Sequence, residues 1–358
     1  MRALAKPGPE LRESLFRSQL LAWYDAHARD LPWRESRDPY RVWVSEIMLQ
    51  QTRVAAVIEH YHEFLRRFPT VQKLAAAREA SVLAAWSGLG YYRRARMLHA
   101  AAKIVARERG GKFPEKAAEW RELPGIGRYT AAAVASIAFG EAVAVVDGNV
   151  ERVLKRVSGK RIAGEDLWRA AENLLDRRRP GDFNQAMMEL GAVVCTPRAP
   201  SCLTCPVMKL CTTRGELAGV GKPPQQKKRR IHYALITQCG DSRPRLSGGP
   251  DVSGRNVGKV FMVRRPRDAR LMAAMWELPE IPPPADHAKP AFTLRHSITV
   301  TDYTVHVWRI PEVAPPFSRS LREGGSHLSN GRWVAIEQLP KLALTGLARK
   351  ILSRQQTL

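Results

Sequence analysis

Four of the five cysteines lie within 17 residues, in the pattern Cys195-x6-Cys202-x2-Cys205-x5-Cys211. Four thiolates in so short a segment can surround one centre. Zinc usually takes two close pairs of ligands separated by a longer loop. The irregular spacing here instead favours a cubane iron–sulfur cluster, with a zinc ion or four unligated thiols as the alternatives. A cluster or metal in this segment indicates a reducing compartment. The fifth cysteine, Cys239, has no assigned role.

The chain is strongly basic. Its 358 residues contain 58 lysines and arginines against 34 aspartates and glutamates, a formal net charge of +24. We therefore expect a polyanionic partner, with nucleic acid as the first candidate and an anionic membrane surface as the alternative. No apolar run approaches the roughly 20 residues that a membrane span needs. Met1–Glu10 lacks the apolar stretch of a secretory signal.

Hydrophobic spacing predicts a helical first half. Asp38 and Pro39 are expected to be the N-cap and first residue of one helix, and Ala142–Val146 is expected to be extended. The predicted helices are Leu11–His27, Tyr40–Tyr61, Val71–Trp86, Tyr91–Arg109, Thr130–Phe139, one over Val150–Val157, Leu167–Leu175 and Phe183–Val194.

The second half has a different pattern. Lys222–Arg230 has two prolines, five basic residues and no apolar residue, which predicts a linker. Beyond it, apolar alternation predicts strands, followed by a terminal helix. The predicted elements are strands at Ile231–Thr237, Lys259–Val263 and Tyr303–Trp308, a loop at Gly240–Gly258 and a helix at Leu342–Leu352. We thus predict a mainly α domain at 1–221, a basic linker at 222–230 and a smaller α+β domain at 231–358.

Leu123–Thr130 (LPGIGRYT) is a glycine-containing turn before a run of small residues. Gly125 and Gly127 allow positive φ and close approach of the main chain. Tyr129 or Thr130 is expected to begin a helix, so the turn would offer free N–H groups to a phosphate. The alternative is an ordinary interhelical turn.

Two carboxylates lie in sequence surroundings that are compatible with a catalytic role. Glu46 lies among apolar residues of a predicted helix, and burial would favour its neutral form, as a general acid near pH 7 requires. The alternative is a surface glutamate. Asp147 precedes Gly148 and a helix, so it is an N-cap or a catalytic carboxylate set against a bound sugar.

The predicted helix Tyr91–Arg109 is rich in arginine, including Arg93 and Arg96. Its basic residues alternate with Tyr91 and Tyr92 and follow a glycine turn. This pattern is typical either of nucleic-acid contact or of a solvated helix face.

Several strings occur in an order that resembles the adenine DNA glycosylases of the MutY type, within the helix-hairpin-helix superfamily that includes endonuclease III. They are Leu31–Arg34 (LPWR), Ser45–Thr52 (SEIMLQQT), Gly88–Tyr92 (GLGYY), Leu123–Gly127 (LPGIG), Val146–Asn149 (VDGN) and the four cysteines. The resemblance covers residues 11–215 closely and the remainder loosely. The first two strings look specific to the adenine branch.

The resemblance implies catalytic roles. Glu46 would protonate adenine N7, and Asp147 would stabilise the oxocarbenium sugar, with a covalent intermediate as the alternative. Asn149 would orient Asp147 or the attacking water. Tyr129 stands where bifunctional lyases carry lysine; a phenol cannot form a Schiff base, so a monofunctional enzyme is expected.

The resemblance also implies DNA contacts. Arg34 and Gln185 would line the adenine pocket. Gln51 and Tyr91 would insert into the duplex beside the extruded base. The backbone at Gly125 and Gly127 would bind a phosphate. The cofactor implied at Cys195, Cys202, Cys205 and Cys211 is a [4Fe-4S] cluster.

The second half resembles a Nudix-like domain that reads 8-oxoguanine, on the strength of Leu271–Pro279 and Trp333-Val334. It departs from the family at Met275, where glycine is usual, and at Leu294-Arg295-His296, where the family has Phe-Ser-His. His296 is retained as a binding residue. The departures indicate that recognition is weaker or uses other contacts, with Arg295 or Ser297 as candidates. No cluster of glutamates follows Trp276, so binding rather than hydrolysis is expected.

The expected function is hydrolysis of the N-glycosidic bond of adenine paired with 8-oxoguanine or guanine in double-stranded DNA. The alternatives are a glycosylase or lyase for another base, such as thymine in T:G, and a non-catalytic lesion-binding protein. We expect a monomer with no membrane association, in the cytoplasm of a bacterium and associated with the nucleoid.

Overall fold

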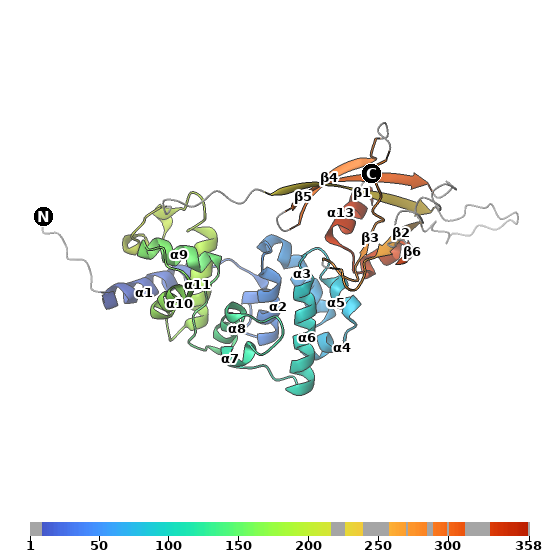
Figure 1. Cartoon of the computed structure of the whole chain (residues 1–358). Coiled ribbons are helices and arrows are strands. Elements are labelled where there is room, and N and C mark those ends of the chain that lie inside the picture. Colours follow the sequence, from blue (N-terminus) through green and yellow to red (C-terminus); the bar gives the residue numbers. More distant parts are fainter. Residues whose placement is uncertain are drawn as a thin grey trace, which may run out of the picture. The chain divides into compact units, whose positions relative to one another are not determined.

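A computed structural model describes residues 9–215, 226–238, 258–269, 271–284, 289–298, 301–311 and 330–356. Cys239 and nearly all of the loop predicted at Gly240–Gly258 lie outside these residues. The chain forms two compact units (Figure 1). Unit 1 comprises Met1–Ala76 and Met97–Lys222, and unit 2 comprises Ala77–Arg96 and Pro223–Leu358. This division differs from the predicted one, because a segment of the helical half belongs to unit 2.

Unit 1 is helical. In chain order its elements are α1 (Pro9–His27), η1 (Pro32–Arg34), α2 (Pro39–Leu49), α3 (Val54–Arg67), α4 (Val71–Ala76), α6 (Arg93–Glu108, which begins in unit 2), α7 (Ala117–Trp120), α8 (Arg128–Phe139), α9 (Gly148–Ser158), α10 (Gly164–Leu174), α11 (Pro180–Val193), η2 (Cys202–Thr204) and η3 (Met208–Leu210). Helices α7 and α8, joined by the Leu123–Gly127 turn, form a helical hairpin.

Local chemistry explains where several helices begin and end. Asp38 Oδ1 accepts a hydrogen bond from Arg41 N over 2.8 Å, which confirms the predicted cap of α2. Helix α8 begins slightly earlier than predicted, with Gly127 as its N-cap, and ends at Gly140 in the left-handed conformation (φ 71°). Its small residues Ala131–Ala135 are at most 1% exposed, so neighbouring helices approach its axis closely.

Two of the predicted helices are wrong. The helix predicted at Tyr40–Tyr61 is two helices, because Gln51 adopts φ 54° between α2 and α3. The helix predicted at Val71–Trp86 is also two, α4 and α5 (Glu79–Ala85), separated by extended backbone at Arg78. Ala142–Val146 joins no sheet. Its amides at Ala144 and Val145 donate instead to side chains from α10 and α11.

Unit 2 is built on a mixed sheet with the order β3-β2-β1-β5-β4, and β6 also pairs with β2. Its elements are α5, β1 (Lys227–Gln238), β2 (Lys259–Arg264), β3 (Trp276–Glu277), β4 (Phe292–Ile298), β5 (Thr301–Pro311), β6 (Gly331–Ala335), η5 (Ile336–Lys341) and α13 (Gly346–Gln356). Strands β1 and β5 are parallel, from Lys227 opposite Thr301 to Thr237 opposite Pro311. The last four residues of the predicted linker are therefore strand, since β5 satisfies their backbone hydrogen bonds.

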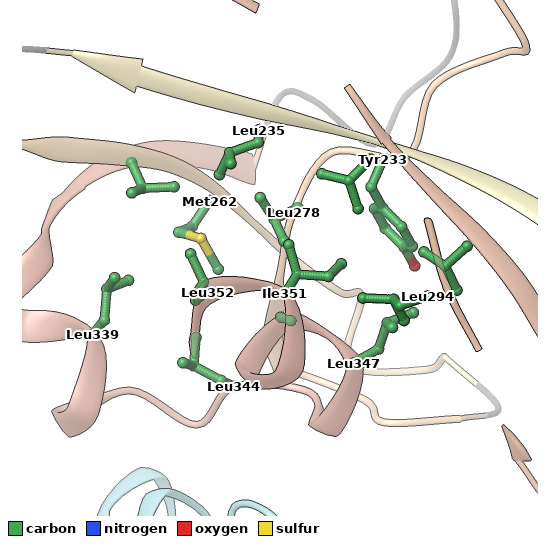
Figure 2. Packing of buried hydrophobic residues seen from close by; sticks show 14 of the residues in the cluster. Tyr233, Leu235, Met262, Leu278, Leu294, Leu339, Leu344, Leu347, Ile351 and Leu352 are labelled. Atoms are coloured by element: carbon green, nitrogen blue, oxygen red, sulfur yellow. The ribbon is translucent and has the colours of Figure 1, made fainter. Parts of the chain in front are cut away.

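Helix α13 covers one face of this sheet and closes the core of unit 2 (Figure 2). Leu347 and Ile351 of the helix are at most 5% exposed, as are Leu235 and Val305 of β1 and β5. The terminal helix predicted from the sequence is thus confirmed, although it begins four residues later. No helix in the described part of the chain has the length and apolarity needed to cross a membrane.

Candidate active site

Glu46 lies on α2 and is 6% exposed. Its Oε2 accepts a hydrogen bond from the Tyr129 hydroxyl over 2.8 Å. Burial raises the pKa of Glu46 from 4.5 to about 7; the charge of Asp147 acts in the same direction, and the Tyr129 hydrogen bond opposes both. Glu46 is therefore a carboxyl group that can hold a proton near neutral pH.

Tyr129 is on the first turn of α8, opposite Glu46. Its hydroxyl also lies 3.1 Å from Met188 Sδ on α11. Burial, together with the neighbouring carboxylates Glu46 and Asp147, raises the pKa of Tyr129. The phenol is thus neutral and acts as a hydrogen-bond donor to Glu46.

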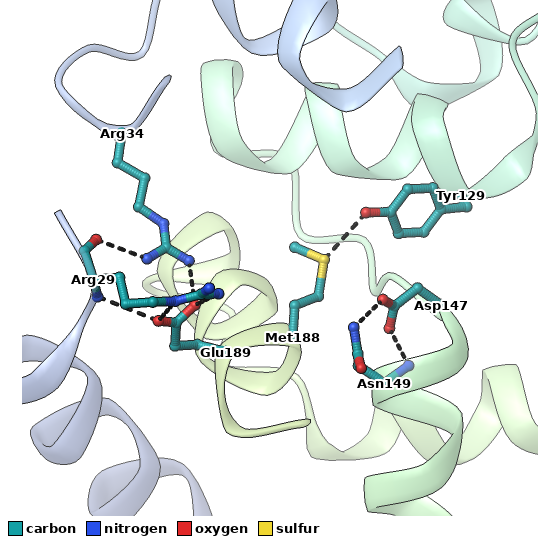
Figure 3. Close-up of polar contacts among 7 residues, drawn as sticks. All are labelled: Arg29, Arg34, Tyr129, Asp147, Asn149, Met188 and Glu189. Atoms are coloured by element: carbon teal, nitrogen blue, oxygen red, sulfur yellow. Dashed lines mark hydrogen bonds and ion pairs between the residues drawn. The ribbon is translucent and has the colours of Figure 1, made fainter. Parts of the chain in front are cut away.

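Asp147 is the N-cap of α9 (Figure 3), which confirms the first of the two interpretations of this residue. Its Oδ1 accepts from the backbone N–H groups of Asn149 and Val150 at 2.9 and 2.7 Å. Its Oδ2 accepts from Asn149 Nδ2 at 2.9 Å. These donors fix the orientation of the carboxylate, so capping and a catalytic position are compatible here.

The chain reaches Asp147 through a segment fixed by a buried amide. Asn184 on α11 is 2% exposed. Its Oδ1 accepts from Val145 N at 3.2 Å, and its Nδ2 donates to Val143 O and Ser136 Oγ, both at 2.9 Å. This side chain replaces the missing sheet partners of residues 143–145 and sets the start of α9.

Asn149 is connected to the cysteine segment through Arg152. The Arg152 guanidinium donates to Asn149 Oδ1 at 2.8 Å, to Gly191 O at 2.6 Å and to Cys195 O at 2.8 Å. Gly191 also packs directly on Asn149, because a Cβ at this glycine would lie 2.5 Å from Asn149 Cβ. The position of Asn149 thus depends on the end of α11.

A buried ion-pair group holds Arg34 (Figure 3). Glu189 has a side chain only 1% exposed; its Oε2 pairs with Arg34 Nη2 at 2.8 Å, and its Oε1 pairs with Arg29 Nε at 2.6 Å. Burial opposes ionisation of Glu189, but the hydrogen bonds from Arg29 and Arg34 outweigh it and lower the pKa of Glu189 to about 2. Arg34 also lies over the Tyr24 ring, at 5.4 Å.

Gln185 and Gln51 were predicted to contact the substrate or DNA. Gln185 is half-buried on α11 and shares a helix face with Met188 and Glu189, three and four residues later. Gln51 is exposed in the left-handed turn after α2. The adjacent Gln50 side chain donates to Thr130 Oγ1 at 3.1 Å and connects this turn to α8.

The glycine turn before α8 partly matches its prediction. Gly125 has φ 78°, and a Cβ there would lie 2.4 Å from Met97 Cβ, so only glycine fits. Gly127 is different: it is the N-cap with φ −88° and ψ 175°, a conformation open to any residue. A Cβ at Gly127 would meet nothing within 4 Å. The turn therefore leaves the first N–H groups of α8 accessible.

The four cysteines line one cavity in unit 1. Its walls are otherwise mainly apolar, and Arg156 Nη1 donates to Cys195 Sγ at 3.3 Å while the Arg214 amide donates to Cys211 Sγ at 3.5 Å. Four sulfur donors, an apolar wall and N–H groups aimed at sulfur fit a thiolate-ligated cluster. The fit rests on the lining of the cavity, because the described His, Cys, Asp and Glu side chains form no group of three that is already arranged to hold a metal ion.

Tyr91 and His296, two of the predicted binding residues, belong to unit 2. Tyr91 is 47% exposed. His296 lies on β4 opposite Tyr303, and burial lowers its pKa. Met275, which replaces the usual glycine, is fully buried. Ser297, one of the alternative contacts, donates to Asp302 Oδ1 at 2.5 Å.

Arg93 and Arg96 of the basic helix differ. Arg93 is exposed, as a DNA contact requires. Arg96 pairs with Glu79 at 3.2 Å and donates to Ala273 O at 2.5 Å, so its guanidinium is engaged within unit 2.

Sequence reasoning missed the supporting residues of the site: Arg29, Arg152, Met188 and Glu189. The available signal for Glu189 was a carboxylate within the apolar helix predicted at Phe183–Val194, the same signal that singled out Glu46. Its partner Arg34 is 155 residues away, so the pair could not be read from local spacing.

The chain is similar to known DNA repair proteins. The family model of the HhH-GPD superfamily of base excision DNA repair proteins matches residues 44–174. The adenine DNA glycosylase of Mus musculus is 41% identical over 319 residues, covering 74% of this chain and 60% of the mouse protein. That of Rattus norvegicus is 35% identical over 408 aligned residues, covering 94% of this chain and 77% of the rat protein.

Among solved structures, that of a thermostable thymine-DNA glycosylase is similar to this chain. It is 32% identical with a TM-score of 0.54, covering 57% of this chain and 97% of that one. The helical fold, the family model and the rat relative lead to the same assignment. The chain belongs to the adenine DNA glycosylases of the helix-hairpin-helix base excision repair superfamily.

Proposed function

We propose that this protein hydrolyses the N-glycosidic bond of adenine paired with 8-oxoguanine or guanine in duplex DNA. The observation that carries the proposal is the buried Glu46, whose pKa is raised to about 7 beside the capped carboxylate of Asp147. A protonated acid and a separate carboxylate are the two groups that glycosidic cleavage needs.

Glu46 is the general acid in this proposal. Adenine is a poor leaving group as an anion, and protonation at N7 lets it depart neutral. A group with a pKa near the working pH transfers a proton most effectively. The neutral Tyr129 phenol orients Glu46 through the 2.8 Å hydrogen bond.

Asp147 stabilises the positive charge that develops on the sugar as the bond breaks. Its carboxylate cannot rotate freely, because three N–H groups hold it from Asn149 and Val150. Asn149 orients Asp147 and, through it, the attacking water. No lysine occupies the Tyr129 position, which supports hydrolysis without a Schiff-base lyase step.

The substrate contacts in this proposal are those that the family resemblance implies. Arg34, fixed by Glu189, and Gln185 line the adenine pocket. The N-terminus of α8 after Gly125 binds a backbone phosphate. Gln51 and Tyr91, both exposed with positive φ, insert beside the extruded nucleotide. The net charge of +24 supports a DNA partner.

We also propose a [4Fe-4S] cluster held by Cys195, Cys202, Cys205 and Cys211. When bound, such a cluster supplies a rigid cross-link of the loop after α11, and no step of the cleavage is assigned to it. The chain's own contribution is Arg156, which donates to Cys195 Sγ and to the carbonyls of Thr196 and Pro197 at 2.7 and 3.0 Å.

Unit 2 is proposed to be a Nudix-like domain that reads the base opposite adenine. Ser297 is bonded to Asp302 and His296 has a lowered pKa, so a neutral His296 is the proposed contact, with the exposed Arg295 as its neighbour.

The test is strand cleavage by alkali after incubation with duplexes containing A:8-oxoguanine, A:G or T:G. Adenine should be released from the first two. The similarity to a thymine-DNA glycosylase structure makes the T:G duplex the necessary comparison. Asp147→Asn should abolish release while DNA binding is retained. Absence of breaks from A:8-oxoguanine at saturating wild-type protein contradicts the proposal, and turnover by Asp147→Asn contradicts the assigned carboxylate.

A further inference from the structure

The loop that carries Tyr91 is bound to the sheet of unit 2. We propose that this sheet positions Tyr91 for insertion into DNA, with Ser87, Tyr92 and Arg349 as the positioning residues. The inference rests on the proposed function and adds a role for unit 2 that is separate from reading the opposite base.

The loop itself is built to project one aromatic ring. Gly88, Gly90 and Tyr91 have φ values of 114°, 70° and 47°. A tyrosine in the left-handed region is strained, and such strain persists only where the surroundings enforce it. Trp86 and Tyr92 on either side are at most 4% exposed, whereas Tyr91 is 47% exposed.

A single carbonyl of unit 2 holds both ends of this loop. Leu344 O accepts from Ser87 Oγ at 2.8 Å and from Tyr92 Oη at 3.0 Å. Ser87 and Tyr92 are 1% and 4% exposed. Because both hydrogen bonds are buried, losing either donor costs more than it would at the surface. Arg349 on α13 donates to Ser87 Oγ at 3.0 Å and completes the contact.

The carbonyl is in turn fixed to the sheet. Leu344 forms a parallel bridge with Trp276 of β3. The Trp276 amide donates to Ala343 O at 2.8 Å, and Thr345 N donates to Trp276 O at 2.9 Å. A continuous set of hydrogen bonds therefore runs from the sheet to the residues that flank Tyr91.

A second contact fixes the chain after the loop. Arg94 lies over both the Trp86 and Tyr91 rings, at 5.5 Å from each, and donates to Leu89 O at 3.2 Å. Arg96 donates to Ala273 O of unit 2. The first turn of α6 is thus bound to the same unit, and the direction of the Tyr91 ring is set from both sides.

The experiment uses the full chain. The double variant Ser87→Ala/Tyr92→Phe removes both donors to Leu344 O but keeps the rings. Arg354→Met is the matched control, because Arg354 is also on α13 yet contacts Thr293 O and the Phe292 ring of β4. Tyr91→Ala is the reference for loss of insertion. Each variant is made in two forms. The form that also carries Asp147→Asn is used to measure binding without cleavage, and the form with Asp147 intact is used to measure excision.

Insertion is measured by fluorescence of 2-aminopurine placed beside 8-oxoguanine. Excision is measured under single turnover on A:8-oxoguanine and on a duplex with an abasic analogue opposite adenine, where no purine has to be unstacked. The double variant should match Tyr91→Ala in fluorescence and lose about tenfold in excision on A:8-oxoguanine, as expected for a lost buried hydrogen bond. The double variant should excise adenine opposite the abasic analogue at the wild-type rate. The Arg354→Met control should match the wild type in every measurement.

Wild-type fluorescence in the double variant overturns the inference. So do equal losses on both duplexes, because a general folding defect would not discriminate between them. If the double variant does not fold, Tyr92→Phe alone decides, with a loss of about threefold confined to A:8-oxoguanine. If the wild-type protein binds and brightens the probe but excises no base, the proposed function fails while the inference stands.

Discussion

The Tyr129 hydroxyl donates to Glu46 Oε2 over 2.8 Å and so acts on the pKa of the proposed acid. Two effects oppose each other at Glu46. Burial favours the neutral carboxyl, whereas the hydrogen bond favours the carboxylate. Burial is the larger effect, and the pKa of Glu46 rises to about 7.

Excision should therefore fall as pH rises through about 7, because Glu46 loses its proton. The pKa of Glu46 is higher in the folded chain than its ordinary 4.5, so the folded state binds the proton more tightly. The resulting stabilisation is fully present below pH 4.5 and is lost as pH rises through 7. Glu46→Gln should lack excision at all pH values and be more stable than wild type at pH 8, but not at pH 4. Single-turnover rates and urea unfolding test both; equal stability at pH 8 would disagree.

Tyr129→Phe should move the alkaline limb of the excision profile to higher pH. The variant removes the hydrogen bond that lowers the pKa of Glu46, so the acid stays protonated further into the alkaline range. Tyr61→Phe is the control, because the Tyr61 hydroxyl is buried without a hydrogen-bond partner in the described part of the chain. A limb that does not move in Tyr129→Phe would show that the phenol does not tune Glu46.

Glu189→Ala should destabilise the fold by about 2 to 4 kcal/mol and weaken adenine excision. The loss leaves Arg29 and Arg34 without their buried partner, although both can be partly rehydrated. Glu63→Ala removes a carboxylate from exposed pairs with Arg66 and Arg67 and should cost less than about 1 kcal/mol. Denaturant midpoints compare the two, and similar losses would contradict the special status of Glu189.

Gly191→Ala should reduce excision on the order of 10- to 100-fold, because the new Cβ would force Asn149 and the Asp147 carboxylate out of position. Alanine is otherwise the better helix residue. Gly346→Ala at the start of α13, where a Cβ meets nothing within 4 Å, should leave the rate unchanged. Wild-type excision by Gly191→Ala would mean that α11 yields without disturbing Asn149.

The purified protein should be brown and contain iron and acid-labile sulfide in equal amounts, with little zinc. Cys202→Ser should lower the iron content. Arg156→Met should speed iron loss to a chelator, because Arg156 binds Cys195 Sγ and the neighbouring carbonyls. Stoichiometric zinc in a colourless preparation would replace the cluster by a zinc site.

The two carboxylates of the proposed catalytic pair were predictable because each had a local signal. Glu46 interrupts an apolar helix, and Asp147 stands directly before a helix start. The geometry confirms that Glu46 is buried and that Asp147 caps α9. Their roles in the reaction remain predictions.

Other features had no local signal. The break at Gln51 contains no glycine or proline. Strand β4 (Phe292–Ile298) alternates less clearly than its partner β5 and was missed. Lys227–Arg230 lacks apolar residues and was predicted to be a linker, yet pairing with β5 makes it strand. For β4 and for Lys227–Arg230, a distant partner strand, β5, decides the backbone conformation.

Unit 2 is formed by two separate stretches of the chain, Ala77–Arg96 and Pro223–Leu358, and this affects how the chain folds. Ser87 and Tyr92 find their acceptor at Leu344, 257 and 252 residues further along. A growing chain therefore presents Ser87 and Tyr92 long before their acceptor exists. Contacts of such high sequence separation slow folding, so we expect unit 2 to mature last and refolding to be limited by the closure of this contact.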